Sequence, residues 1–391
     1  MKRKILLIPL VLLLVISLVA TGCAAPAPAP APVPGPPGPP GPPGAPALAP
    51  APAPRPAAPI EFTYGSVHPQ THFYCAQLPE ELFAKVTVAT EGRVRVRGIY
   101  GGALVQTMNT LELTESRVAD IGHIVVAYWP KKLPMASAFS SIRDFDLGNR
   151  LDSRGIGALY WKMYDEFPEL RAEWQARGIT PIWSMPSFVY YILSREPIKT
   201  LADLKGKKVR TIGKYMPMTM EALGAVPMAL SWAEIYTSLQ TGLIDAVYTC
   251  AESCYKDKFH EVAPYVLITG PDLGASLGLP GGTGAINNDS FALLSKADQE
   301  TFLKIGREMM PYFCDRIEEK SRQLIKDYKK EGATITHLSD ADVAEWIRLA
   351  PNFYELIAAD LNEQGLPGTE YVKKYQEAAE DYISGKWKPY E

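Results

Sequence analysis

Strands and helices alternate at short intervals between residues 200 and 250, and this pattern constrains the fold more than any other feature of the sequence. The expected order is a strand at 207–212, a helix to 224, a strand at 226–230, a helix at 231–242 and a strand at 243–248. Ser231 and Glu234 have capping-box spacing at the start of the second helix, and Gly242 suits a left-handed C-cap at its end. Strands joined through helices at such short intervals pair in parallel, with the helices on the faces of the sheet. We therefore predict an α/β protein with parallel-type sheets.

The same alternation extends towards both ends of the chain. Further strands are expected at 61–64, 93–97, 119–126 and 179–183, with helices at 71–91, 109–117 and 155–177. After residue 295 the sequence predicts helices at 296–331, 340–363 and 367–385. Pro311 falls inside the first of these, where proline breaks or kinks a helix. The chain is therefore expected to be globular from residue 60 onwards and to end in a block of helices.

The first 23 residues resemble a bacterial lipoprotein leader. Three basic residues at 2–4 precede the apolar run Ile5–Ala20, which is shorter than the roughly 20 residues that span a bilayer. This is typical of a signal peptide. The run leads to Ala20-Thr21-Gly22-Cys23, which resembles a lipobox. We expect residues 1–22 to be removed and Cys23 to be lipidated, so that the protein is extracytoplasmic and anchored to a membrane; a plain signal peptide is the alternative.

Residues 24–59 are of low complexity and form a predicted tether. They hold 17 of the 35 prolines, and nearly all the others are Ala or Gly. Such a composition cannot bury a core. Pro-rich chain favours polyproline II at about 3.1 Å per residue, so 36 residues reach about 110 Å. Residues 23–59 are therefore expected to be a lipidated cysteine followed by a stiff spacer.

The charge balance excludes one large class of partner. The chain has 40 Lys and Arg against 43 Asp and Glu, for a net charge of −3. Removal of the three basic residues of the leader takes this value from −3 to −6. A nucleic-acid-binding protein would carry a clustered basic excess. We therefore expect no nucleic-acid partner.

One motif raises the alternative of an exported serine hydrolase. Gly274–Gly278 (GASLG) has the spacing of a nucleophile elbow around Ser276, and Asp289 and His337 follow in the order of a catalytic triad. The elbow requires a helix directly after the serine. Residues 279–284 (LPGGTG) cannot form that helix. A glycine-rich crossover is favoured, and no enzymatic activity is expected.

The metal-ligating residue types give a weak pattern. His68 and His72 are four apart, a spacing that can place both on one helical face, but Pro69 lies between them and no third ligand type stands nearby. We expect no metal site, and we place His68 at a cleft edge. The cysteines of the globular part lack the paired Cys-x2-Cys spacing of zinc sites and are expected to be buried thiols or one disulfide: Cys75, Cys250, Cys254 and Cys314. No Walker loop or full Gly-x-Gly-x-x-Gly motif occurs, and no cofactor is expected.

Arg210 is the most informative single residue. It lies near the carboxyl end of the predicted strand 207–212. Ligands of open α/β sheets bind just beyond such ends. A guanidinium there can hold a carboxylate with two parallel hydrogen bonds. A surface arginine on an edge strand is the alternative.

Several segments of the sequence resemble those of a known protein family. Leu201–Arg210 (LADLKGKKVR) is similar to the DLKGxKxR segment of the solute-binding proteins of TRAP (tripartite ATP-independent periplasmic) transporters, the dicarboxylate-binding or DctP type. Further similar segments are Glu221–Met228 (EALGAVPM), Glu234–Asp245 (EIYTSLQTGLID), Phe83–Lys85, Thr90–Val94 and Gly101–Leu104. The resemblance covers about residues 60–385 and is most specific in the 200–245 block.

The resemblance implies a two-lobe periplasmic-binding-protein fold that closes over a ligand, with C-terminal helices packed across both lobes. Lobe I would comprise 60–187 and about 274–315, and lobe II about 188–273 and 316–391. The family's signature arginine, which pairs with a ligand carboxylate, falls on Arg210. The implied partners are a small organic acid and the small and large membrane subunits of the permease. A ligand-presenting sensor lipoprotein is a further alternative.

The expected ligand follows from departures within the resemblance. Thr249 stands where the family often has an asparagine, and Tyr190 stands near a common second arginine. Fewer cationic groups disfavour a highly charged ligand. We expect a monocarboxylate with an apolar or aromatic body, and Arg210 as its anchor. The other candidate ligand-binding residues are Thr249, Tyr64, His68, Tyr128, Trp183, Tyr190, Trp232 and Glu252.

Overall fold

The computed structural model describes residues 35, 58–142, 151–186, 189–270, 273 and 280–391. Pro56–Glu391 forms one compact unit, and the fold below is that of this unit alone. The leader, Cys23 and nearly all of the predicted tether lie outside the described residues. Among the described helices, none is long and apolar enough to cross a bilayer.

The first of two sheets has five strands in the order β2-β1-β3-β10-β4. Their bounds are β1 Ile60–Gly65, β2 Val94–Ile99, β3 Ile121–Ile124, β4 Ile179–Pro186 and β10 Pro280–Asn287. β1 pairs in parallel with β2 and β3, as the alternating pattern predicts. β10 is antiparallel to both β3 and β4, so the sheet is mixed.

The second sheet has six strands in the order β11-β9-β5-β8-β6-β7. Their bounds are β5 Tyr190–Ser194, β6 Lys208–Thr211, β7 Val226–Ala229, β8 Ala246–Cys250, β9 Tyr265–Ile268 and β11 Thr334–His337. β6 is parallel to β7 and β8, which confirms the parallel arrangement expected for 207–248. β5 is antiparallel to β8 and β9, so this sheet is also mixed.

Local signals in the 200–250 segment form, and the Ser231–Glu234 capping box and the Gly242 C-cap among them were predicted. Thr200 and Asp203 make a capping box at the 3-10 helix Leu201–Leu204, and Ser231 and Glu234 make another at Trp232–Glu234. The helix α7, Ile235–Thr241, ends at Gly242, whose φ of 79° lies in the left-handed region. Glycine adopts this conformation at low cost because it has no Cβ.

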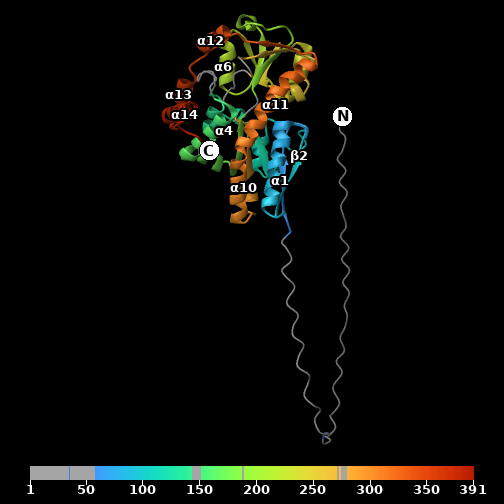
Figure 1. Ribbon diagram of the computed structural model, residues 1–391, viewed down its shortest axis with the longest axis vertical. Coiled ribbons are helices and arrows are strands. Elements are labelled where there is room, and N and C mark those ends of the chain that lie inside the picture. Colours follow the sequence, from blue (N-terminus) through green and yellow to red (C-terminus); the bar gives the residue numbers. More distant parts are fainter. Residues whose placement is uncertain (1–34, 36–57, 143–150, 187–188, 271–272, 274–279) are drawn as a thin grey trace, which may run out of the picture. The chain divides into compact units, whose positions relative to one another are not determined.

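Helices surround the two sheets (Figure 1). Their bounds are α1 Leu78–Ala89, α2 Thr110–Glu115, α3 Pro134–Phe139, α4 Ser153–Glu166, α5 Pro168–Gln175, α6 Tyr215–Ala222, α8 Ala251–Lys256, α9 Asn288–Phe291, α10 Lys296–Glu308, α11 Met310–Lys330, α12 Asp340–Leu349, α13 Phe353–Glu363 and α14 Gly368–Ile383. A π-helical turn, η1 Phe73–Gln77, precedes α1. α1 and α10 lie side by side against the first sheet.

Prolines set the ends of several helices. The expected break at Pro311 is confirmed, because α10 ends at Glu308 and α11 starts at Met310 with Pro311 in its first turn. The helix expected at 155–177 is instead two helices, with Pro168 at the start of α5. The helix expected at 340–363 is also divided, at residues 350–352, which include Pro351.

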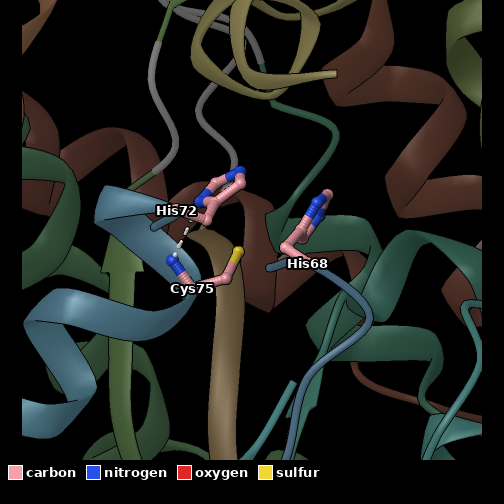
Figure 2. Close-up of side chains that lie close together, drawn as sticks. All are labelled: His68, His72 and Cys75. Atoms are coloured by element: carbon pink, nitrogen blue, oxygen red, sulfur yellow. Dashed lines mark hydrogen bonds between the residues drawn. The ribbon is translucent and has the colours of Figure 1, made fainter. Parts of the chain in front are cut away.

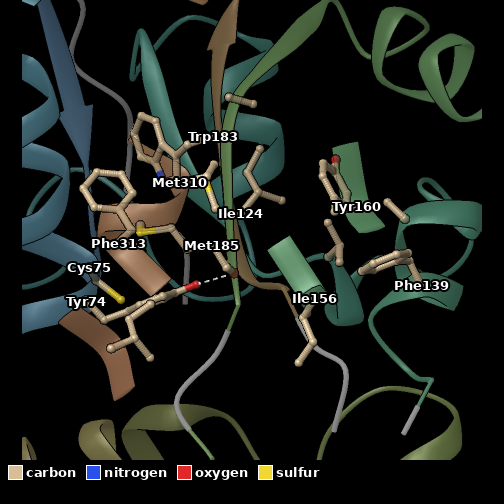
Figure 3. Close-up of a cluster of buried hydrophobic side chains, with 14 of the residues drawn as sticks. Tyr74, Cys75, Ile124, Phe139, Ile156, Tyr160, Trp183, Met185, Met310 and Phe313 are labelled. Atoms are coloured by element: carbon tan, nitrogen blue, oxygen red, sulfur yellow. Dashed lines mark hydrogen bonds between the residues drawn. The ribbon is translucent and has the colours of Figure 1, made fainter. Parts of the chain in front are cut away.

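Aromatic and sulfur-containing side chains pack among the aliphatic residues in the core beside β4. Figure 3 shows Trp183 and Met185 of β4 with Met310 and Phe313 of α11, and the Tyr74 hydroxyl donates to the Met185 carbonyl at 3.1 Å. Burial of each large apolar side chain contributes about 1.5–3 kcal/mol. These contacts fix the strand ends from which the site is built.

The long helix α11 and the C-terminal helices contact both sheets. α11 packs on α4 and β4 of the first sheet and on α8 and β11 of the second. Trp346 of α12 is buried in the core of the second sheet, whereas α14 packs on α4 beside the first. The helices therefore pack across both halves, as expected.

Candidate functional site

A cavity of about 60 Å³ lies where strands of both sheets end. The side chains that line it from the first-sheet half are Val67, His68, Tyr74, Cys75, Thr107, Thr110, His123, Val125 and Tyr128. Those from the second-sheet half are Tyr190, Ile212, Trp232, Thr249, Cys250 and Ser253. The lining is aromatic and weakly polar.

The topology explains why these residues meet. The lining segments directly follow the carboxyl ends of β1, β3, β6 and β8, which is where ligands of α/β sheets bind. Tyr190 starts β5 and lies opposite Cys250 at the end of the antiparallel strand β8. His123 lies within β3, and a Cβ at Gly282 of β10 would come within 2.1 Å of its Nε2 atom. Glycine at 282 therefore leaves the space that the imidazole occupies.

Arg210 of β6 is fully buried beside this cavity. Its Nε and Nη2 atoms each donate to the Leu230 carbonyl at 3.3 Å, and Nη2 also donates to the Tyr128 hydroxyl at 3.0 Å. The guanidinium lies 5.7 Å from the ring centre of Trp232. Nη1 is buried and has no hydrogen-bond partner among the described residues. The group therefore contacts two cavity-lining aromatics and keeps one nitrogen available for an acceptor.

Most of the residues expected at the site meet there. His68, Tyr128, Tyr190, Trp232 and Thr249 all line the cavity. They come from five segments spread over 182 positions of the chain, counting from 68 to 249. Sequence similarity in the 200–245 block gave no information on how these segments assemble.

Four expected site residues do not line the cavity: Arg210, which lies behind its lining residues Tyr128 and Trp232, and Tyr64, Trp183 and Glu252. Tyr64 and Trp183 are fully buried in the core, with ring centres 6.0 Å apart, and the Tyr64 hydroxyl donates to the Cys75 carbonyl at 2.7 Å. Glu252 is also fully buried, but it lies against His72 at 2.8 Å. The structure thus gives the two aromatic residues a packing role and makes Glu252 the partner of a histidine.

His68, His72 and Cys75 form a cluster at the cavity wall (Figure 2). A turn closed by the hydrogen bond from the His72 N–H to the Pro69 carbonyl brings the two imidazole centres within 4.2 Å. Cys75 follows in η1, and its Sγ lies 3.6 Å from Nε2 of His123. The approach of Cys75 and His123 to the histidine pair was not expected from the sequence. The three-residue step from His72 to Cys75 is the one signal in the sequence that was available.

Burial disfavours the charged forms of three groups in and beside the cluster, His68, His123 and Cys75. Burial lowers the pKa of His68, and the nearby His72 lowers it further against the opposing effect of Asp257. Burial also lowers the pKa of His123 to about 3 and raises the pKa of the Cys75 thiol well above its usual value. The cavity wall therefore offers imidazole lone pairs and a thiol, while Arg210 supplies the positive charge.

The hydrolase alternative gains no support from the described residues. Ser276 lies outside them. Asp289 is in α9 beside the first sheet, whereas His337 ends β11 of the second sheet and faces the Gly270 carbonyl at 3.2 Å. All four cysteines of the described residues are free thiols, so the alternative of a disulfide among them is wrong.

Solved structures with the same fold are solute-binding proteins. A TRAP solute-binding protein from Rhodoferax ferrireducens in complex with copurified benzoate matches with a TM-score of 0.73 and 16% identity, over 84% of this chain and 100% of that one. One from Desulfovibrio salexigens with bound orotic acid matches with a TM-score of 0.70 and 23% identity, over 83% of this chain and 99% of that one. At these identities the likeness concerns the fold.

Curated relatives match over part of their length. The ectoine-binding periplasmic protein TeaA of Halomonas elongata is 27% identical over 202 residues, which are 51% of this chain and 57% of that protein. The 2,3-diketo-L-gulonate-binding periplasmic protein YiaO of Escherichia coli is 31% identical over 150 residues, which are 38% of this chain and 43% of that protein. The match thus spans about half the length of these relatives.

The family model of bacterial extracellular solute-binding proteins, family 7 (DctP), matches residues 64–360, which is about three quarters of the chain and includes both sheets. With the fold, the cavity at the strand ends and the buried arginine, this match shows that the chain belongs to the DctP family of TRAP solute-binding proteins.

Proposed function

We propose that the protein captures a small organic monocarboxylate with an apolar or aromatic body, and that Arg210 holds its carboxylate. The buried guanidinium with its unpartnered Nη1 is the observation that supports this most directly. A buried cation without a counter-charge is unfavourable, and a ligand carboxylate provides that charge. Among the described residues, no carboxylate forms an ion pair with Arg210.

The composition of the cavity favours one carboxylate over several. Among the described residues, no arginine or lysine lines the cavity and Arg210 is the cation beside it, so a second anionic group would find no further cation there. Tyr128, Tyr190 and Trp232 offer ring faces and edges instead. Aromatic side chains favour a flat, apolar ligand body. Benzoate and orotate, named for two proteins of similar fold, are acids of this general kind.

We take the two sheets as the cores of two lobes, with lobe I formed by 60–187 and about 274–315. The chain passes from one sheet to the other three times, between β4 and β5, between β9 and β10, and between β10 and β11 through α11. A cavity of about 60 Å³ holds no more than a few water molecules, so an aromatic acid enters only when the lobes separate. The contacts of His72 with Glu252 and of Arg210 with Tyr128 join the two halves and would break on opening. The ligand then stabilises the closed state by contacts with both lobes.

Delivery to a membrane permease follows from family membership. The closed protein would dock on the small and large membrane subunits of a TRAP transporter. Lipidation of Cys23 and the Pro-rich spacer would keep it near them, outside the cytoplasm. Neighbouring genes for one small and one large multi-span membrane protein are expected.

A panel of acids tests the ligand class. The mature protein is titrated with benzoate, orotate, pyroglutamate, malonate and galacturonate, and each is followed by thermal unfolding and calorimetry. We expect benzoate or orotate to bind most tightly, and benzamide, which lacks the charge, to give no shift. Tightest binding of malonate or galacturonate would overturn the apolar monocarboxylate, and a complete absence of binding would overturn the role in organic-acid capture.

A further inference from the structure

The wall of the cavity carries a set of side chains that the capture of a carboxylate does not require. His68, His72 and Cys75 each offer one ligand atom, and these three atoms all lie within 4.8 Å of one another. They come from a span of eight residues between β1 and α1. His123 joins them from β3 through the thiol. Imidazole nitrogen and thiolate sulfur are the donors that zinc-class transition metals prefer.

The distances suit tetrahedral coordination. Zn–S bonds of about 2.3 Å and Zn–N bonds of about 2.0–2.1 Å place a sulfur and a nitrogen ligand about 3.6 Å apart. The distance from Cys75 Sγ to His123 Nε2 is 3.6 Å. The ligand atoms of His68, His72 and Cys75 lie within 4.8 Å of one another and would have to approach by up to about 1 Å to reach tetrahedral spacing, and His123 is placed relative to them through its contact with the thiol.

Each histidine of the pair has a carboxylate behind one ring nitrogen. His72 Nε2 lies 2.8 Å from Glu252 Oε2, and His68 Nδ1 lies 3.7 Å from Asp257 Oδ2. Metal-binding histidines characteristically donate their second ring N–H to a carboxylate, which fixes the ring and its tautomer. The arrangement leaves Nε2 of His68 and Nδ1 of His72 as the ring nitrogens whose lone pairs can bind a metal ion.

The other ring nitrogen of His72, Nδ1, faces Cys75. Nδ1 accepts the backbone N–H of Cys75 at 3.2 Å, and Figure 2 shows this ring nitrogen directed at that residue. A metal ion would take over this lone pair. The buried thiol would ionise on binding, as thiol ligands do.

We propose that His68, His72, Cys75 and His123 form a binding site for a zinc-class transition-metal ion at the wall of the cavity. The proposal goes beyond solute capture and does not depend on which acid is bound. Because Glu252 and Asp257 belong to the segment after β8 of the second sheet, an occupied site would also favour the arrangement in which the two halves meet.

Cobalt(II) reports on the site, because a Co²⁺–thiolate bond gives a charge-transfer absorption. The mature protein, treated with chelator and kept reduced, is titrated with Co²⁺ and then Zn²⁺ in the absence of any organic acid. We expect one Co²⁺ per chain with the thiolate band, and its displacement by Zn²⁺. Cys75→Ser should abolish the band, and Glu252→Gln should weaken Zn²⁺ binding about 10–100-fold through the supporting shell.

Matched controls exclude general metal binding. Cys314→Ser removes another buried thiol, and His260→Ala removes another histidine with a carboxylate partner, Glu331 at 2.8 Å. Both variants should bind Co²⁺ and Zn²⁺ as the wild type does. His68→Ala, at a partly exposed position, keeps the test valid should Cys75→Ser fail to fold. No thiolate band, or unchanged Zn²⁺ affinity in both Cys75→Ser and His68→Ala, would overturn the site. Benzoate binding to the metal-free protein is measured separately, so the two proposals can fail independently.

Discussion

Replacement of Arg210 by methionine separates binding from stability. Methionine keeps an unbranched, flexible side chain, about two atoms shorter than arginine, and removes the charge. In the ligand-free protein the change leaves the Leu230 carbonyl and the Tyr128 hydroxyl without their donor, at about 1 kcal/mol each. It also removes a buried cation without a counter-charge, a change that is often neutral or stabilising. We therefore expect the free energy of unfolding to change by less than about 2 kcal/mol.

The effect on binding should be much larger. A hydrogen bond to a charged group contributes about 1.5–3 kcal/mol, and the variant would leave the ligand carboxylate buried without a partner, which raises the total to about 2–4 kcal/mol. At about 1.4 kcal/mol per factor of ten, the dissociation constant should rise about 30-fold to several hundred-fold. Arg210→Lys keeps the charge but loses the planar fork, so its dissociation constant should lie between those of the wild type and Arg210→Met.

Calorimetric titration with benzoate and urea unfolding of the same samples measure both quantities. Arg195→Met, an exposed arginine just after β5 of the same sheet, is the matched control and should leave both unchanged. An Arg210→Met protein that binds benzoate within threefold of the wild type would refute the anchor. Destabilisation by more than about 4 kcal/mol would show instead that the guanidinium is a structural strut.

Two further predictions concern other parts of the chain. Burial works to raise the pKa of Asp120, but hydrogen bonds from Ser290 and Thr63 outweigh it and lower the pKa below its usual value. The stability that this carboxylate contributes is thus present above about pH 4 and lost as the pH falls through its folded-state pKa. Asp120→Asn should cost about 1.5–3 kcal/mol at neutral pH and flatten the acid limb of the stability curve, whereas Asp289→Asn at an exposed position should do neither; equal curves for wild type and Asp120→Asn would contradict this. Cys23→Ser should move the protein from the detergent phase to the aqueous phase in a phase-partitioning assay, and a wild-type protein already in the aqueous phase would exclude lipidation.

The fold could be predicted best where the sequence has many short-range signals for the ends of helices and strands. Capping residues, breaker glycines and the spacing of strands act within a few residues, and they place the elements between 200 and 250 correctly. β11 was not expected between two helices, since it becomes a strand by pairing with β9, almost 70 residues earlier. The antiparallel course of β10 likewise depends on its partners β3 and β4.

The site was predictable in part for the same reason. Arg210 could be singled out because its strand and its motif are local, and its role as the ligand anchor stays a prediction. Tyr64 and Trp183 look like pocket residues in the sequence, but which face of a strand points to the core depends on the layer packed against it. The meeting of Cys75 with His123 requires two segments 48 positions apart to be brought together by the first sheet.

A single helix shared by both halves has a consequence for how such a receptor diversifies. α11 runs for 21 residues, about 32 Å, and packs against elements of each sheet. Because it contacts both sheets, its packing affects the angle at which the two halves meet. Substitutions along α11 can therefore change the angle between the two halves in the ligand-free protein. The balance between ligand-free and ligand-bound forms would change with it, although no group that contacts the ligand is altered.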